Sequence, residues 1–381
     1  MKKLTLVALT LTISGAATAA CCYFAALDKD VTQPAQRAFI SWDEQEKIEA
    51  FTVQPQFEGN ADEFGMVIPS PSKPKLQEMP KDFFKALAVF TILEPMDLTK
   101  FKRMMANQRA GGSPNMRYEG MRSASPPPVR VLEHGVVGNL DYKILEADKA
   151  DALFSWLKAN KYHYGGDEAT LGYYINQKWN FTVMKIDPRQ MKRSANGKFL
   201  GDITPTRFTF RTEKPIYPLR ITQISVKDRT DVLLYVMARK KMDMDGAWSY
   251  EQNFLSMWNQ AMSFAIPEKL TAEEKRWQKN VSQKQPVPSP GGAQLEWSGK
   301  LTASRLEVLT HAEKYHRQAP PEEVKRLKIL TGHLKPDWYL TKFRKNFARS
   351  EMTHDIGLVP ARYNGTPDDL EYVSILPTSP P

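Results

Sequence analysis

The sequence predicts an α+β fold: a mainly antiparallel sheet with packed helices, followed by a helical and basic C-terminal region. Short stretches in the first two thirds of the chain alternate apolar and polar residues, which is typical of strands that bury one face. Stretches with apolar residues at helical spacing lie between them. After about Lys241 the alternation gives way to helix start signals and a break rich in proline and glycine, so the helical region is expected there.

The first 20 residues have the features of a secretory signal peptide. Two lysines follow Met1, residues 4–13 form a short apolar core, and Ala17-Thr18-Ala19 supplies the small residues that a signal peptidase accepts. The apolar core is much shorter than the roughly 20 residues that a membrane-spanning helix needs. We therefore expect cleavage after Ala19 or Ala20 and export to the periplasm or the outside of the cell.

Both cysteines of the chain, Cys21 and Cys22, would then lie at the new N-terminus. Lipid attachment to Cys21 would anchor the protein to a membrane, but Thr18 stands where that signal usually has leucine, so anchoring is the less favoured alternative. A disulfide between the two would be strained, because adjacent Cα atoms lie about 3.8 Å apart and ordinary disulfides span about 4.4–6.8 Å. Two thiolates supply at most half of a zinc site. Pairing with another chain, or a minor role at a free end, stays open.

Composition indicates a folded protein. The 381 residues are 41% hydrophobic and 10% aromatic, enough to bury a substantial core and to exclude wholesale disorder. Beyond the signal no apolar run reaches membrane-spanning length, so no transmembrane segment is expected. Most of the net charge of +10 falls between Glu268 and Arg349. This basic segment could attract anionic envelope polymers or lipid headgroups, and export argues against nucleic acid.

Five stretches alternate as half-buried strands do, which favours an antiparallel sheet with one solvent-exposed face. Their expected buried residues are Ala38, Ile40 and Trp42; Phe51, Val53 and Phe57; Trp179, Phe181 and Val183; Phe208 and Phe210; and Val232, Leu234 and Val236.

Helical patterns interrupt these strands. The first is expected to begin at Pro80 and end before Pro95. It groups Phe83, Phe84, Leu87 and Phe90 on one side. In the second, Asp148 can cap a helix whose buried stripe is Leu153, Trp156 and Leu157. The segment from Asn107 to Pro128 has no periodicity and is expected to be a long mobile loop.

The C-terminal part carries signals for two further helices. Thr271 and Glu274 fit a capping box, so a helix should run through Trp277. The second should begin at Pro321, turn Val324, Leu327 and Leu330 inward, and end at Gly332. The predicted organisation is thus a signal peptide at 1–20, an α+β core domain at 21–245, and a mainly helical basic region at 246–381 with a Pro/Gly linker near 286–292.

No catalytic, cofactor-binding or metal site is predicted. His311 and His316 are five residues apart, which does not stack them on one helical face. His163 lies beside Tyr162, Tyr164 and Asp167, a cluster more typical of a turn than of a proton-transfer site. The adjacent acid pairs have simpler roles at helix starts and turns; they are Glu273-Glu274, Glu322-Glu323 and Asp368-Asp369. Cys22 lies at an expected chain end, where a nucleophile would lack a rigid setting.

Several short motifs resemble the bacterial family known as domain of unknown function 2330. They are Gln36-Arg37, the WLKANKY stretch from Trp156, Gly172-Tyr173-Tyr174, Trp179-Asn180-Phe181, Phe210 followed by Tyr217-Pro218-Leu219-Arg220, Tyr339-Leu340-Thr341-Lys342 with lysine where arginine is more usual, and Glu351-Met352-Thr353-His354-Asp355. The resemblance implies an exported bacterial envelope protein with no assigned activity and no known cofactor. This sequence departs from the family pattern at Cys22, where a small residue is usual. The resemblance therefore gives little support to thiol chemistry at this position. The motif around Pro218 suits a structural corner at a strand better than a binding site.

The favoured hypothesis is an exported, soluble, non-catalytic protein that binds or scaffolds a component of the cell envelope, with the basic segment as its contact surface. The alternative is an enzyme acting on an envelope polymer through carboxylates or His163, brought together only in three dimensions.

Overall fold

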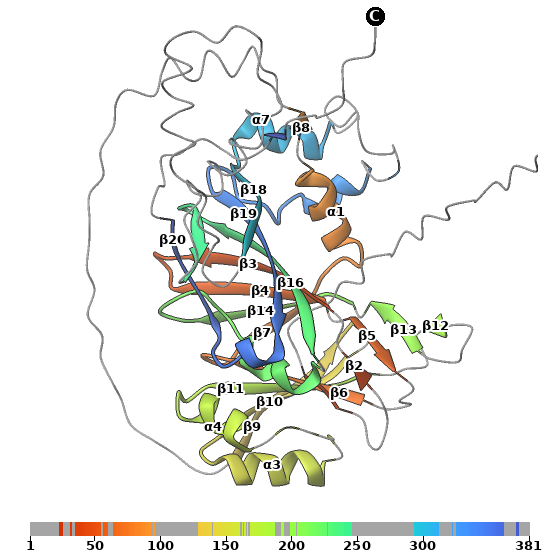
Figure 1. Ribbon diagram of the computed structural model, residues 1–381, viewed down its shortest axis with the longest axis vertical. Coiled ribbons are helices and arrows are strands. Elements are labelled where there is room, and N and C mark those ends of the chain that lie inside the picture. Colours follow the sequence, from red (N-terminus) through yellow and green to blue (C-terminus); the bar gives the residue numbers. More distant parts are fainter. Residues whose placement is uncertain are drawn as a thin grey trace, which may run out of the picture.

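The protein is described by a computed structural model in which strands predominate (Figure 1). It describes residues 23–25, most of 31–95, most of 129–245, 293–311, most of 322–361, and 371–372. The expected signal peptide, Cys21, Cys22 and the expected loop at 107–128 lie outside these described residues. Within them, no helix is both long enough and apolar enough to cross a membrane.

A seven-stranded sheet forms the centre of the molecule (Figure 1). Its strands in spatial order are β18 (Gln294–Lys300), β19 (Tyr339–Ala348), β16 (Arg229–Ala238), β3 (Ala35–Asp43), β4 (Ile48–Gln54), β14 (Thr206–Arg211) and β7 (Lys75–Glu78). All neighbours pair antiparallel except β16 and β3, which run parallel. The prediction of a mainly antiparallel sheet is confirmed, although this sheet is mixed.

Both faces of the central strands are buried, so the expected solvent-exposed face is wrong for β3 and β16. Alternate residues of these strands enter two different cores. Ala38, Ile40 and Trp42 with Val232, Leu234 and Val236 line the first; Phe39 with Leu233, Tyr235 and Met237 lines the second. The alternation predicted from the sequence correctly describes the face toward the first core. The residues between these positions are also apolar, so the other face is buried in the second core.

The second core is closed by short helices. The helix α1 (Phe83–Phe90) packs against the 3₁₀ helix η6 (Arg326–Leu330), and Phe83 meets Phe39 edge-on at 5.4 Å between ring centroids. The predicted apolar stripe of α1 is buried as expected. Of the residues expected inward near Pro321, Leu327 and Leu330 are buried, and Gly332 follows the helix with a positive φ of 79°, where glycine avoids strain.

A five-stranded antiparallel sheet with two helices forms the opposite end of the molecule (Figure 1). Its strands in order are β1 (Tyr23–Ala25), β6 (Phe64–Ser70), β11 (Asn180–Ile186), β10 (Leu140–Ala147) and β9 (Val129–Val137). The helices α3 (Ala150–Ala159) and α4 (Glu168–Ile175) bury Leu153, Leu157 and Tyr174 against Phe181 of β11. In α3, Trp156 is only partly buried, and Lys149 rather than Asp148 occupies the N-cap, without a side-chain hydrogen bond.

The remaining strands form smaller sheets. A three-stranded sheet consists of β15 (Ile216–Tyr217), β20 (Ile356–Pro360) and β17 (Met242–Met244), a four-stranded sheet of β12 (Lys192–Arg193), β13 (Phe199–Asp202), β5 (Gln56–Gly59) and β2 (Val31–Thr32), and a two-stranded sheet of β21 (Glu371–Tyr372) and β8 (Glu94–Pro95). The second expected strand is therefore divided: Phe51 and Val53 lie on β4, whereas Phe57 lies on β5 in another sheet. Position 55 between them is a proline, which cannot donate to a strand ladder.

The prediction of a helical C-terminal region is wrong for the described residues. From 293 onward these residues form β18, β19 and β20, while the helical elements are short: α7 (Ala303–Leu306), η4 (Glu307–Leu309), η6 and η7 (Arg349–Glu351). The expectation of packed helices as a main feature fails as well, because α3, the longest helix described, has only ten residues. The central sheet includes strands from both sides of residue 245. The helix expected through Trp277 and the linker at 286–292 lie outside the described residues.

Candidate functional site

The candidate site is built where η2 (Arg220–Ser225) meets residues 349–355. The strand β15 ends at Tyr217, and η2 begins three residues later, so the motif around Pro218 forms a corner between a strand and a helix. This agrees with the predicted structural role. We call the contact between η2 and residues 349–355 the clasp.

Tyr217 anchors the corner in the first core. Its side chain is fully buried, its ring meets Phe51 edge-on at 5.9 Å, and its hydroxyl donates to Gln36 Oε1 at 2.5 Å. Gln36 in turn donates from Nε2 to Thr230 Oγ1 at 3.4 Å. The corner is thereby bonded to β3 and β16, the parallel pair at the middle of the sheet.

Asp355 links the clasp to α4. Its Oδ1 accepts a hydrogen bond from the Tyr174 hydroxyl at 2.7 Å and another from the Arg220 backbone N–H at 2.9 Å. The Tyr174 hydroxyl also accepts from the Ile221 backbone N–H at 3.0 Å. Burial raises the pKa of Asp355 to about 6, against the opposing effect of these donors. Its Oδ2 is buried and has no hydrogen-bond partner among the described residues.

The Arg220 side chain fastens the other side of the clasp. Its guanidinium lies over the Tyr173 ring at 4.3 Å, a cation–π contact, and its Nη1 donates to the Thr353 carbonyl at 3.1 Å. Burial, and then the charge of Asp355, raise the pKa of Tyr173. Residues far apart in sequence are thus joined by one connected polar network.

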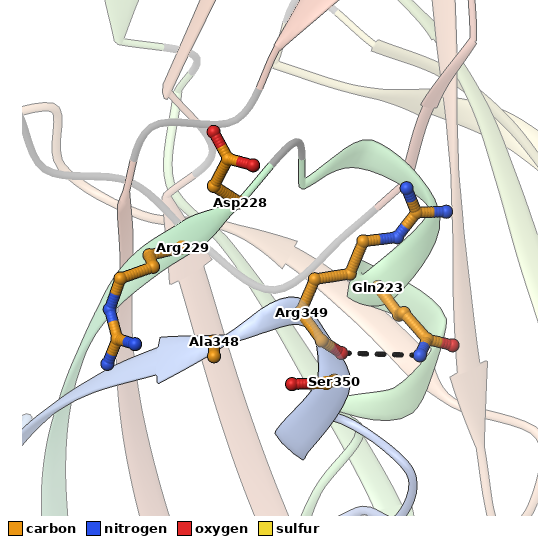
Figure 2. A pocket seen from close by; sticks show the side chains of 6 residues that line it. All are labelled: Gln223, Asp228, Arg229, Ala348, Arg349 and Ser350. Carbon is orange, nitrogen blue, oxygen red and sulfur yellow. Dashed lines mark hydrogen bonds between the residues drawn. The ribbon is translucent and has the colours of Figure 1, made fainter.

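A hollow of about 550 Å³ lies beside the clasp (Figure 2). Its lining residues are Gln223, Asp228, Arg229, Ala348, Arg349 and Ser350. Gln223 Nε2 donates to the Arg349 carbonyl at 3.3 Å, and the Arg349 backbone N–H donates to the Asp228 carbonyl at 2.8 Å. These bonds fix the backbone around the hollow.

Two guanidinium groups extend from opposite sides of this hollow (Figure 2). Arg229 donates to the side chain and the carbonyl of Asn346 and lies 4.0 Å from Glu351. The exposed guanidinium of Arg349 has no hydrogen-bond or ion-pair partner within the described part of the chain. The hollow therefore offers a solvent-facing cation that a ligand could pair with.

Of the histidines and acid pairs considered from the sequence, the structure describes only His311 and Glu322. His163, His316, Glu273-Glu274 and Asp368-Asp369 lie outside the described residues. The exposed ring of His311 bonds with Thr310 Oγ1 at 3.0 Å, and Glu322 pairs with Lys325 at 2.9 Å.

Cations of the basic segment are largely paired with acids within the described residues. The pairs are Lys300 with Asp337, Arg326 with Asp82, Lys335 with Asp43, Lys342 with Glu296, Arg344 with Glu296 and Asp231, and Lys345 with Glu351. Asp43, Asp82, Asp231 and Glu351 lie outside the basic segment in sequence. For the described cations, a count of charge along the sequence therefore overstated the free positive surface.

A second buried carboxyl group, Glu49, was not among the residues predicted from the sequence. It is fully buried on β4, and burial raises its pKa well above the usual range for a carboxyl group. Its Oε2 accepts from the Ile216 backbone N–H at 3.0 Å, and its Oε1 is without a partner among the described residues. The signal was present, because Glu49 is two residues before Phe51 and therefore on the same inward face.

Comparison with known proteins gives one finding. A family model described as an uncharacterized protein conserved in bacteria (DUF2330) matches residues 15–358. No curated protein and no solved structure matches the chain.

Proposed function

Because the chain belongs to the bacterial family of domain of unknown function 2330, we propose that it is an exported, non-catalytic protein that binds or scaffolds an anionic polymer of the cell envelope. The observation that carries this proposal is the arginine-rimmed hollow beside the clasp (Figure 2). The signal-like first 20 residues support export.

The clasp supports a binding role because its polar groups are already used in holding elements together. Tyr174, Arg220 and Asp355 bond to one another and to backbone groups, so they fix the position of η2 and of the segment that carries Arg349. A rigid support of this kind lowers the entropy that a surface loses when it binds. Arg349 projects from it toward solvent.

The proposed contact differs from the one expected from the sequence. The described cations of the basic segment attract anions only weakly where they already have acidic partners. Arg349 belongs to that segment and lacks a partner among the described residues, and Arg229 lies on the other side of the hollow. Guanidinium groups bind phosphate and carboxylate through paired donors, which suits a polymer bearing either group.

Binding to isolated envelope fractions tests this function. The exported protein should sediment with wall polymer at low salt and lose binding as the ionic strength rises. Arg349→Gln should weaken binding by about threefold to tenfold, the effect of losing one exposed charged contact. Lys328→Gln is the matched control, because it removes one exposed cation of the same segment on η6, away from the hollow.

Two outcomes would overturn the proposal. Absence of binding to wall polymer at low salt would exclude the contact, and equal losses for Arg349→Gln and Lys328→Gln would assign binding to net charge alone. Binding to vesicles with anionic headgroups is measured separately. If the protein binds these vesicles more strongly than wall polymer, the ligand is a membrane surface and not a polymer.

An enzyme acting on an envelope polymer is the second candidate, and Asp355 is the observation that favours it. A carboxyl group with a pKa of about 6 beside a tyrosine hydroxyl has the properties of a general acid. Hydrolysis of purified wall polymer by the wild type, abolished in Asp355→Asn, would support this candidate.

A further inference from the structure

A second group of cations lies on the face of the seven-stranded sheet that carries the second core. Arg207 is on β14, paired in register with Thr52 of β4 and Gln77 of β7. Its neighbour Phe208 points into the first core, so Arg207 points to the opposite face. Its Nε donates to Thr52 Oγ1 at 3.1 Å.

Arg207 is only partly exposed, and no carboxylate among the described residues pairs with it. Burial alone lowers its pKa, which means that the protein pays a desolvation cost for this charge without an offsetting acid. The hydrogen bond to Thr52 uses one of the five N–H donors of the guanidinium. Its terminal nitrogens make no hydrogen bond to another residue that the structure describes.

Three more basic side chains gather around this position. Burial, and then the charge of Arg207, lower the pKa of His333, whose ring lies 5.4 Å from Phe83 at the N-terminal end of α1. Burial also lowers the pKa of Lys335, which lies in the field of both Arg207 and Arg239. Arg207 therefore lies within electrostatic range of both His333 and Lys335, and Lys335 lies within range of Arg239, so the cluster draws on three separate segments of the chain.

One acid and one aromatic ring hold Lys335 and Arg239 in place. Asp43 accepts from Arg239 through both oxygens, at 3.3 and 3.0 Å, and lies 3.9 Å from Lys335 Nζ. The ring of Trp338 lies 4.0 Å from Lys335 Nζ and 5.0 Å from the Arg239 guanidinium carbon. Three permanent cations thus face one carboxylate, which leaves about two positive charges uncompensated at this end of the sheet.

We propose that Arg207, His333, Lys335 and Arg239 form a binding site for a phosphate group. A phosphate monoester carries about −1.5 to −2 charges at pH 7 and offers three acceptor oxygens, which matches the uncompensated charge of this cluster. The Arg207 fork can bind two oxygens side by side, while Lys335 supplies a point charge and His333 a further donor. The proposal is independent of the hollow at Arg349.

Titration of the full cleaved chain with inorganic phosphate tests the site. Calorimetry should show saturable binding, and NMR of the His333 ring should show its pKa rising, because a bound anion opposes the effect of Arg207. Arg207→Gln should weaken phosphate binding by about tenfold or more, since a charged hydrogen-bond pair is lost. The matched control is Arg211→Gln, which removes an exposed arginine from the same face of the same strand.

A second variant, Arg207→Lys, distinguishes a loss of phosphate binding from a loss of folding. Arg207→Lys keeps the charge but loses the paired donors, so it should bind phosphate more weakly than the wild type while unfolding at the same urea concentration. Glycerol 3-phosphate is titrated in parallel: tighter binding than inorganic phosphate indicates a phosphoester ligand, and the reverse indicates the free anion. No saturable binding of either, an unchanged His333 pKa, or equal losses for Arg207→Gln and Arg211→Gln would overturn the proposal.

Discussion

At the scale of single residues, two buried carboxyl groups set the dependence of stability on pH. Asp355 and Glu49 both have pKa values raised by burial, so the folded state binds more protons than the unfolded chain just above the ordinary carboxyl pKa. Their contribution to the free energy of unfolding therefore falls as pH rises through that window. Paired acids such as Glu296 and Glu351 have lowered pKa values and act in the opposite sense at lower pH.

For Asp355 the pH window follows from its pKa values in the unfolded and folded chain. The pKa rises from 3.8 in the unfolded chain to about 6 in the fold, so the wild type should lose on the order of 2–3 kcal/mol of this contribution between about pH 4 and pH 6. Asp355→Asn keeps an oxygen to accept from Tyr174 and Arg220 and should flatten that slope. Urea unfolding across this pH range measures it. Asp228→Asn, an exposed carboxylate of the hollow, should keep the wild-type slope; if both variants behave alike, Asp355 is not the source.

For Glu49 the expected effect is a gain in stability. A glutamine resembles the protonated form that burial favours, so Glu49→Gln should avoid the cost of taking up a proton at neutral pH. We expect the variant to be at least as stable as the wild type at pH 7, with the difference shrinking toward pH 5. Chemical denaturation at the two pH values measures it, with the exposed Glu46 of the same hairpin, changed to glutamine, as control. A loss of several kcal/mol at pH 7 would show that the ionised form is needed.

At the scale of elements, the corner between β15 and η2 connects sheets that are distant in sequence. The Ile216 N–H of this corner donates to Glu49, the Tyr217 hydroxyl donates to Gln36, and the Arg220 N–H donates to Asp355. The sequence identified the corner, because proline cannot continue a strand ladder. It could not identify the partners, since Gln36 and Tyr217 are separated by 181 positions.

Removing one hydroxyl tests how strongly this corner is fastened. Tyr217→Phe leaves the buried Gln36 Oε1 with only the 3.4 Å contact from Thr222 Oγ1, and should cost about 1–3 kcal/mol of the free energy of unfolding. Tyr142→Phe is the control, because its hydroxyl bonds to Glu133 at 2.9 Å in a partly exposed position and should cost less. Urea midpoints for the two variants give the comparison, and equal costs would mean that the corner is not specially fastened.

At the scale of the whole molecule, local patterns predicted strands better than their pairing. The alternation at Phe208 and Phe210 and the apolar stripe of α1 were sufficient to predict both elements, because each buries its own regular face. The parallel pairing of β3 with β16 depends on contacts almost 200 residues apart, about which a local pattern carries no information. The C-terminal strands were not predicted, although on β19 the buried residues Phe343, Lys345 and Phe347 alternate with more exposed ones. The positive charge and the helix start signals of this region were given more weight than the short alternation. The cation cluster at Arg207 was missed for the same reason as the parallel pair: its members come from three distant segments of the chain, Arg207, Arg239 and the turn with His333 and Lys335.

The pairing of strands in the seven-stranded sheet indicates what happens if the chain is cut at residue 245. A chain ending there would lose β19, which pairs with β16 along all ten of its residues, and would leave Leu233, Leu234 and Tyr235 on an open edge. An unpaired apolar edge strand promotes aggregation, so we expect residues 21–245 alone to be insoluble or unfolded by circular dichroism. The chain of residues 21–381, purified in parallel, is the control. A folded, monomeric fragment with a cooperative unfolding transition would instead show that the N-terminal part is an independent domain and that β18 and β19 only add to it.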